Sequence, residues 1–203
     1  MKKLILLTAL LLFAVSAYGG PVNVVFLGFP LPLDPWQSGY PYAATLNGGP
    51  GVAVMCDDWV HGGLPGDTWQ ANFTNLGTQN LSLLRFNQLP GALTLYDEAG
   101  WLLLQTEVAP RTEWQSINYA VWNIFYSNAP LLYNAPYWLN QAQMEAAKGF
   151  PGVNFYKVEI YTPLNQYDTN VDGPQELMTL PEPGTLLLLG TGLLGLVGRK
   201  LRL

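Results

Sequence analysis

Two hydrophobic patterns follow one another along the middle of the chain. Short runs rich in β-branched and aromatic residues, or with apolar side chains at every second position, predict strands at residues 22–27, 52–56, 67–73, 81–86 and 154–161. Apolar residues at helical spacing predict helices at residues 91–105, 112–126 and 137–148. Strands that precede a block of helices, with one strand after it, predict a single α+β domain with about three helices.

Two further segments carry neither pattern. Residues 28–51 contain five prolines interleaved with aromatic residues and predict a loop that packs against the domain. Residues 162–180 are polar and rich in turn-forming residues, so they predict a second irregular segment.

The N-terminus has the pattern of a secretory signal peptide. Lys2 and Lys3 precede an apolar run of about a dozen residues, and small residues follow it. We expect cleavage after Gly19, with Ala17 as the alternative. Residues 1–19 are then the signal peptide and residues 20–179 the secreted domain.

The C-terminus, residues 180–203, carries a second apolar stretch. Residues 185–197 have no charge, and the helix expected at about 185–198 is followed by Arg199, Lys200 and Arg202. The 15 residues 184–198 would span about 22 Å as a helix, against about 30 Å for the bilayer core. We therefore expect a provisional membrane stop, with the three cations on the cytoplasmic side.

A Pro-Glu-Pro tripeptide, Pro181, Glu182 and Pro183, stands just before this stretch. Tripeptide, short apolar helix and basic end together resemble the PEP-CTERM protein-sorting signal, which an exosortase of Gram-negative bacteria recognises and cuts. The resemblance implies export, transient membrane anchoring, and release to the cell surface or an exopolysaccharide matrix. The alternative is an ordinary C-terminal anchor with a chance Pro-Glu-Pro.

Charge and rare residues narrow the possible functions. The secreted domain has four Lys and Arg against thirteen Asp and Glu, a net charge of −9, which disfavours nucleic acid as a partner. Cys56 is the only cysteine, so an intrachain disulfide is excluded. His61 is the only histidine, which excludes a multi-His metal site.

The segment from Cys56 to Asp58, the helix that carries Asn118, and a later Gln-Glu-Leu-Met segment resemble the bacterial thioester-domain-like family. In true thioester domains a cysteine and a glutamine join covalently, and the bond captures an amine of a partner. Here Asn118 stands where that glutamine is expected, and its side chain is one methylene shorter. Gln115, three residues earlier, would give a shifted pair. The alternatives are that Cys56 is a small buried hydrophobic residue, or that it pairs with another molecule.

Asp168, Asn170 and Asp172, followed by Gly173, match the first half of a calcium-binding loop. The twelfth position is Thr179 instead of a bidentate glutamate. Calcium therefore competes with the simpler interpretation of a polar turn, and we expect no other cofactor.

An enzyme is the least favoured class. Cys56, His61 and a neighbouring aspartate supply the residue types of a small hydrolase, but they lie within six residues, whereas a catalytic triad is normally assembled from distant segments. The many aromatic residues suit sugar stacking, although core packing is the simpler interpretation. We expect a non-enzymatic surface or matrix protein, structural or adhesive, with a covalent thioester-type adhesin or a hydrolase as alternatives.

Overall fold

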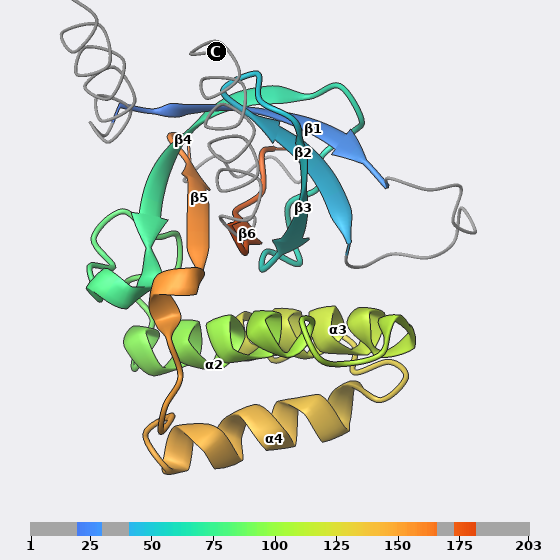
Figure 1. Cartoon of the computed structure of the whole chain (residues 1–203), viewed down its shortest axis with the longest axis vertical. Helices are drawn as coiled ribbons and strands as arrows, with labels where there is room; N and C mark the ends of the chain where they lie inside the picture. The colour runs from blue at the N-terminus through green and yellow to red at the C-terminus, as the bar shows by residue number, and fades with distance from the viewer. Residues whose placement is uncertain (1–19, 30–40, 166–172, 182–203) are drawn as a thin grey trace, which may run out of the picture.

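The computed structural model describes residues 20–29, 41–165 and 173–181. A β-barrel lies above a layer of helices (Figure 1). The strands are β1 (Val22–Gly28), β2 (Tyr42–Leu46), β3 (Gly51–Cys56), β4 (Thr68–Asn75), β5 (Glu159–Pro163) and β6 (Leu177–Thr179). The helices are α2 (Ala92–Gln105), α3 (Trp114–Phe125) and α4 (Ala135–Ala147), with short 3-10 turns η2 (Leu76–Thr78), η3 (Arg111–Glu113) and η4 (Phe155–Lys157).

The six strands form a closed antiparallel barrel in the order β1-β2-β3-β6-β5-β4. β1 closes it by pairing with β4, with Val24 opposite Trp69. The α+β class predicted from the sequence is therefore wrong, because the strands close on themselves and leave no free sheet edge.

Two strands that the sequence pattern did not predict complete this barrel. β2 lies in the segment expected to be a loop, and β6 lies in the segment expected to be irregular. β6 pairs with both β3 and β5, although it has only three residues. Conversely, residues 81–86 form turns instead of a strand, and the strand expected at residues 154–161 begins only at Glu159, after η4.

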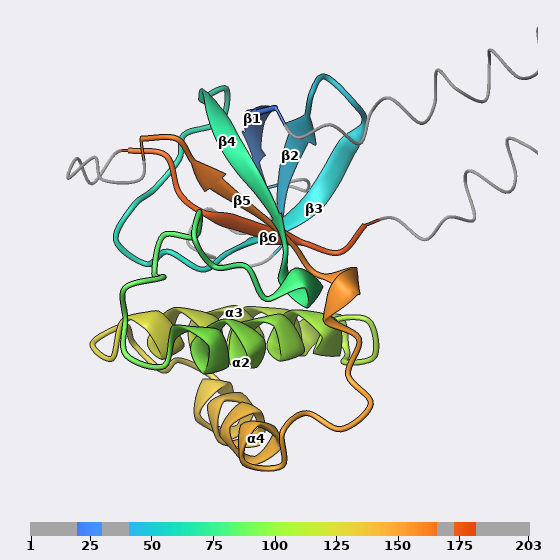
Figure 2. The ribbon, with the colours of Figure 1, turned by 90° about the vertical axis from the view of Figure 1, so that its left-hand side faces the viewer.

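The three predicted helices are present, with boundaries shifted by a few residues. α2 and α3 lie side by side under the barrel, and α4 packs on their far side (Figure 2). α3 is the central helix of this layer, because residues 116–122 are all buried and the helix contacts both α2 and α4.

The buried side chains form two clusters. One fills the barrel and is made of small and medium residues together with Tyr161. The other lies between the barrel and the helices and includes Met55, Tyr96, Ile117 and Met178. Neighbouring strand residues point to opposite faces, so β3 contributes Cys56 to the first cluster and Met55 to the second.

Within the part of the chain that the structure describes, no helix has the length and apolarity needed to cross a membrane. The expected signal peptide at residues 1–19 and the apolar stretch at residues 185–198 lie outside the described residues.

Candidate functional site

A group of buried polar side chains lies where β3 ends above the helices. Asp57 and Asp58 follow the last residue of β3 and are 0% and 1% exposed. Glu176, just before β6, is also 0% exposed. β3 and β6 are neighbours in the barrel, so the end of β3 and the start of β6 bring these carboxyl groups together, although Asp57 and Glu176 are 119 positions apart in the sequence. Buried acids in an apolar core need partners, and those partners define the site.

Asp58 has a complete set of partners. Its Oδ1 accepts hydrogen bonds from the backbone N–H of Val60 (3.1 Å) and of His61 (3.2 Å), and from the Tyr126 hydroxyl (3.0 Å). Its Oδ2 lies 2.8 Å from His61 Nδ1 and pairs with the Arg85 guanidinium. This carboxylate is thus occupied by the protein itself.

Arg85 connects the two acidic segments. Its side chain is 6% exposed, and besides Asp58 its guanidinium donates to the Pro174 carbonyl (2.8 Å). Its backbone N–H donates to Glu176 Oε2 at 3.0 Å. One residue from the turn segment before α2 therefore holds both the β3 end and the approach to β6.

Glu176 accepts hydrogen bonds from two hydroxyl groups of different layers. Tyr96 of α2 donates to Oε1 at 2.6 Å, and Thr162 of β5 donates to Oε2. Burial, followed by the charge of Glu176, raises the pKa of the Tyr96 hydroxyl well above its usual value, so Tyr96 remains a donor. Glu176 is thereby the acceptor that joins the barrel to α2.

Asp57 differs from its two acidic neighbours. Its carboxyl oxygens meet no hydrogen-bond donor in the described ranges. Burial, and after it the negative charge of Glu176, raises the pKa of Asp57 well above the usual value. Burial and this neighbouring charge therefore favour the protonated form of Asp57.

The Cys56 thiol is also buried. Its Sγ donates to the Asp58 carbonyl (3.0 Å) and accepts from the Asp58 N–H (3.3 Å). Burial, then the nearby Asp57, raises the pKa of this thiol well above its usual value. It is therefore a poor thiolate nucleophile.

Asn118 of α3 lies directly against Cys56. Its Nδ2 donates to the Cys56 carbonyl at 2.7 Å, and both residues are at most 1% exposed. The Asn118 Oδ1 finds no donor among the described residues. Gln115, one turn earlier on α3, is only partly buried. Of the two amides that the sequence offered, the structure places Asn118 at the cysteine.

A pocket of about 290 Å³ opens beside this cluster. Aromatic residues of the barrel side and of the helix side face it, together with polar groups of the cluster; the lining residues are Phe26, Phe29, Tyr42, Asp58, Trp59, His61, Gly62, Gly63, Trp122 and Gln175. Trp59 packs on Trp122 with 4.9 Å between ring centroids. We call this space the aromatic pocket.

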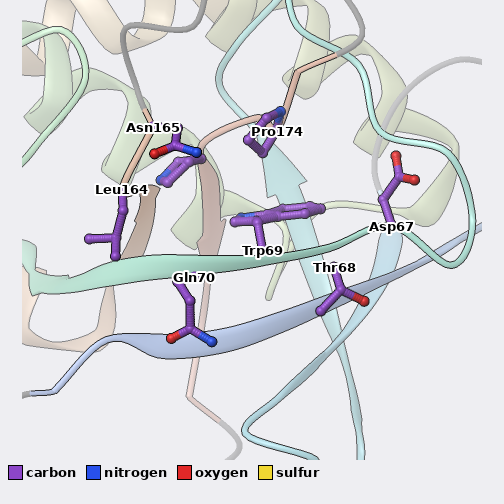
Figure 3. A pocket seen from close by; sticks show the side chains of 8 residues that line it. Asp67, Thr68, Trp69, Gln70, Leu164, Asn165 and Pro174 are labelled. Atoms are coloured by element: carbon purple, nitrogen blue, oxygen red, sulfur yellow. The ribbon is translucent and has the colours of Figure 1, made fainter.

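A second, larger pocket of about 570 Å³ lies against β4. The Trp69 side chain lies across it, and Pro174, Leu164 and Asn165 stand on its other side (Figure 3). Two of its polar side chains are engaged: Asp67 accepts from the Leu64 N–H at 2.7 Å, and Gln70 donates to Asn23 at 3.1 Å.

Sequence reasoning did not identify Arg85, Tyr96 or the role of Glu176. Arg85 lies in residues 81–86, which the pattern assigned to a strand. No local signal marks a residue whose partners lie 24 to 91 positions away.

Other predicted site residues lie elsewhere. Asp168, Asn170 and Asp172 are outside the described residues, and the described ranges contain no group of three or more His, Cys, Asp or Glu that could hold a metal. Pro181 is exposed at the end of the last described range, directly after the partly buried Leu180. Glu182, Pro183, Arg199, Lys200 and Arg202 are outside it.

Comparison with known proteins bears on the C-terminus. The family model described as the PEP-CTERM protein-sorting motif matches residues 179–202. The end of this chain is a PEP-CTERM sorting motif. The prediction for residues 180–203 is confirmed to within one residue at each end. The motif indicates an exported protein that an exosortase sorts, with transient anchoring in the membrane.

The remaining comparisons are weaker. The N-terminal domain of the Streptococcus pyogenes pilus tip adhesin Cpa superimposes with a TM-score of 0.45 and 11% identity, over 81% of this chain and 95% of that chain. No curated protein matches the sequence.

Proposed function

We propose that this chain is a non-enzymatic protein of the cell surface or extracellular matrix of a Gram-negative bacterium, with a structural or adhesive role. The observation that carries the proposal is the sorting motif together with its position. Thr179 is both the last residue of β6 and the first residue of the motif. Cutting after this point releases the whole described domain, so the domain is what the cell displays.

Two features of the site support a role without catalysis. The Cys56 thiol is 1% exposed, and its pKa is raised where a nucleophilic cysteine needs a lowered one. His61 Nδ1 is held by Asp58 and lies 2.8 Å from the Arg85 guanidinium. With Nδ1 held by these two contacts, His61 is better suited to stabilising the fold than to acting as a general base.

Processing in an exosortase-bearing host tests the proposal. We expect the mature chain to end between Pro181 and Thr185 and to appear at the surface or in the matrix. Deletion of the exosortase, or alanine at Pro181, Glu182 and Pro183 together, should leave the tail intact. Glu107→Ala, an exposed acid of the folded domain, is the matched control and should be processed normally. An intact tail on wild-type protein from the exosortase-bearing host would contradict the proposal.

A second candidate, a covalent thioester-type adhesin, is favoured by the contact between Cys56 and Asn118. In that reaction the Cys56 sulfur bonds to the Asn118 side-chain carbonyl carbon, the bond from that carbon to nitrogen breaks, and the thiol proton leaves with the nitrogen as ammonia. The resulting thioester would acylate an amine of a partner and return the thiol. In the structure the Asn118 Nδ2 donates a hydrogen bond to the Cys56 backbone carbonyl at 2.7 Å, which places the amide beside the residue that carries the thiol.

Intact mass distinguishes the two candidates. A thioester makes the chain lighter by one ammonia and leaves Cys56 unreactive to alkylation after unfolding. The variants Cys56→Ser and Asn118→Ala cannot form the thioester, so each should have the mass calculated from its sequence, without the loss of ammonia. Full alkylation of an unfolded wild-type chain of unmodified mass would exclude the covalent candidate. Asn118→Gln, which restores the longer side chain, would show whether the missing methylene is the reason.

A further inference from the structure

We propose that the aromatic pocket binds one ring of a neutral polysaccharide. The inference rests on the proposed function, which it deepens by naming the chemical class that the displayed domain holds. It depends on three properties of the pocket: apolar walls of aromatic rings, an uncharged hydrogen-bonding group without a partner, and a charged floor whose charges are already paired.

The walls are aromatic on both sides. On the barrel side, the Tyr42 ring lies between Phe26 and Phe29, with centroid distances of 5.6 and 5.0 Å. On the helix side, Trp59 packs on Trp122 and remains 37% exposed. The C–H faces of a sugar ring are apolar and pack on aromatic faces, as aromatic side chains with large flat surfaces allow. A pocket of about 290 Å³ suits a single ring of a chain that continues into solvent.

Gln175 supplies the hydrogen-bonding group. It is 4% exposed and lines the pocket, and its side-chain amide has no hydrogen-bond partner within the described residues. Its Nε2 lies 3.6 Å from the position that a Cβ on Gly63 would occupy, and that same Cβ would come within 3.2 Å of Phe26. Glycine at residue 63 therefore keeps the space beside the amide open. An amide offers two donors and one acceptor, which matches the hydroxyl groups of a sugar.

The charges of the floor argue for a neutral ligand. Asp58 is the acid that faces the pocket, and its carboxylate is taken by Arg85, His61 and Tyr126. An ammonium ligand would be held by the aromatic faces alone, because the carboxylate of Asp58 is already engaged. An anionic ligand would need Arg85, whose guanidinium already bonds Asp58 and the Pro174 carbonyl. Recognition then depends on the shape of the pocket and on the unpaired Gln175 amide, and both fit an uncharged sugar.

The test uses the processed protein from its exosortase-bearing host. The probes are maltotetraose, cellotetraose and tetra-N-acetylchitotetraose, titrated with tryptophan fluorescence and saturation-transfer NMR as readouts. We expect saturable binding of at least one probe. Trp59→Ala and Gln175→Ala should each weaken it about tenfold, the loss of about 1.4 kcal/mol. Trp59→Phe should keep most of the affinity, and Tyr156→Ala, an exposed aromatic outside the pocket, should keep all of it. Thermal melting of each variant confirms that it is folded.

Several outcomes would overturn the inference. They are no saturable binding of any of the three probes, binding that both pocket variants leave unchanged, or tetramethylammonium displacing the bound saccharide. The processing assay separates this inference from the proposed function. Normal processing and display without saccharide binding would overturn the sugar site alone, whereas an intact tail in the exosortase-bearing host would overturn the proposed function.

Discussion

At the scale of single residues, Arg85 determines whether the buried acids are tolerated. Replacing it with alanine leaves Asp58 buried without its cationic partner and removes the bond to the Pro174 carbonyl. Breaking a buried pair by removing one partner typically costs about 3–5 kcal/mol. We expect Arg85→Ala to lower the free energy of unfolding by about this amount, as measured by urea denaturation.

Two further variants control for this result. Arg85→Lys keeps the charge but loses the planar fork that reaches two acceptors, so its loss should be intermediate. Lys148→Ala removes a solvent-exposed ion pair with Glu145 and should cost less than about 1 kcal/mol. Equal stability of Arg85→Ala and wild type would mean that the buried network does not hold the fold together.

Asp57 gives the domain a distinctive pH dependence. Because burial raises its pKa in the folded chain, the native state holds a proton that the unfolded state releases above about pH 4. Stability therefore falls as pH rises from that value towards the raised pKa. Asp57→Asn resembles the protonated form, so its advantage over wild type in the free energy of unfolding by urea should grow as the pH rises above about 4.

The comparison with a second acid isolates this effect. Burial raises the pKa of Asp97 to about 6, so Asp97 also makes stability fall with rising pH. This contribution is the same in wild type and in Asp57→Asn, so it cancels when their free energies of unfolding are subtracted. Asp97→Asn alone should gain stability over wild type between about pH 4 and pH 6, with a constant difference above pH 6. A constant difference between Asp57→Asn and wild type above about pH 4 would show that Asp57 is ionised in the fold.

The sequence predicts site residues only where a motif or a short run of neighbours marks them. Cys56 and the amide of Asn118 were paired as candidates because of a motif, and the structure does place them in contact. Arg85 and Glu176 were not paired, because a single charged residue among turns has no pattern that points to a partner 91 positions away. The hydrogen-bond network of Asp58, Arg85 and Glu176 forms only when β3 and β6 pair in the closed barrel, so the sequence alone does not predict it.

At the scale of elements, the close packing of η2 against η4 fixes the turn after β4, and a substitution at Gly77 measures how much this packing contributes to stability. A Cβ on Gly77 would lie 2.7 Å from the backbone nitrogen of Tyr156 in η4 and 2.5 Å from its ring. Backbone atoms cannot move aside cheaply, so Gly77→Ala should cost about 1–3 kcal/mol, measured as a shift in the unfolding midpoint. Gly62→Ala is the matched control, because nothing lies within 4 Å of its Cβ. Similar stabilities of the two variants would mean that η2 and η4 separate easily.

Helices were predicted better than strands for a physical reason. A helix of three or more turns repeats its apolar spacing several times, so α2, α3 and α4 each carry enough signal within their own sequence. β2 and β6 have five and three residues, and β2 lies within a proline-rich segment. Their stability comes from pairing with neighbours on both sides, which the sequence does not display. Without them the strands cannot close, so the barrel itself was missed.

At the scale of the whole molecule, the barrel depends on the residues that directly precede the sorting motif. β6 pairs on both sides, and the Thr179 hydroxyl donates to the Ala53 carbonyl at 2.7 Å. A chain that ends at Pro181 should therefore unfold with the same midpoint as the processed protein. A chain that ends at Gly173 loses Glu176 and β6 and should fail to unfold cooperatively in circular dichroism. Cooperative unfolding of the shorter chain would show that five strands suffice.

The short distance in sequence between β6 and the apolar stretch limits how far the folded domain can lie from the membrane before processing. Five residues, 180–184, separate the end of β6 from the apolar stretch, and they reach at most about 18 Å when fully extended. Leu180 also packs against the helix-side core, which shortens the free length. We therefore expect the folded barrel to lie next to the bilayer surface and to restrict access to the tripeptide. Inserting ten Gly and Ser residues between Leu180 and Pro181 should accelerate processing in a pulse-chase experiment, whereas the same insertion between Gly20 and Pro21 should not. Equal rates for the two insertions would mean that the barrel does not limit access, and that exosortase acts before β6 is in place.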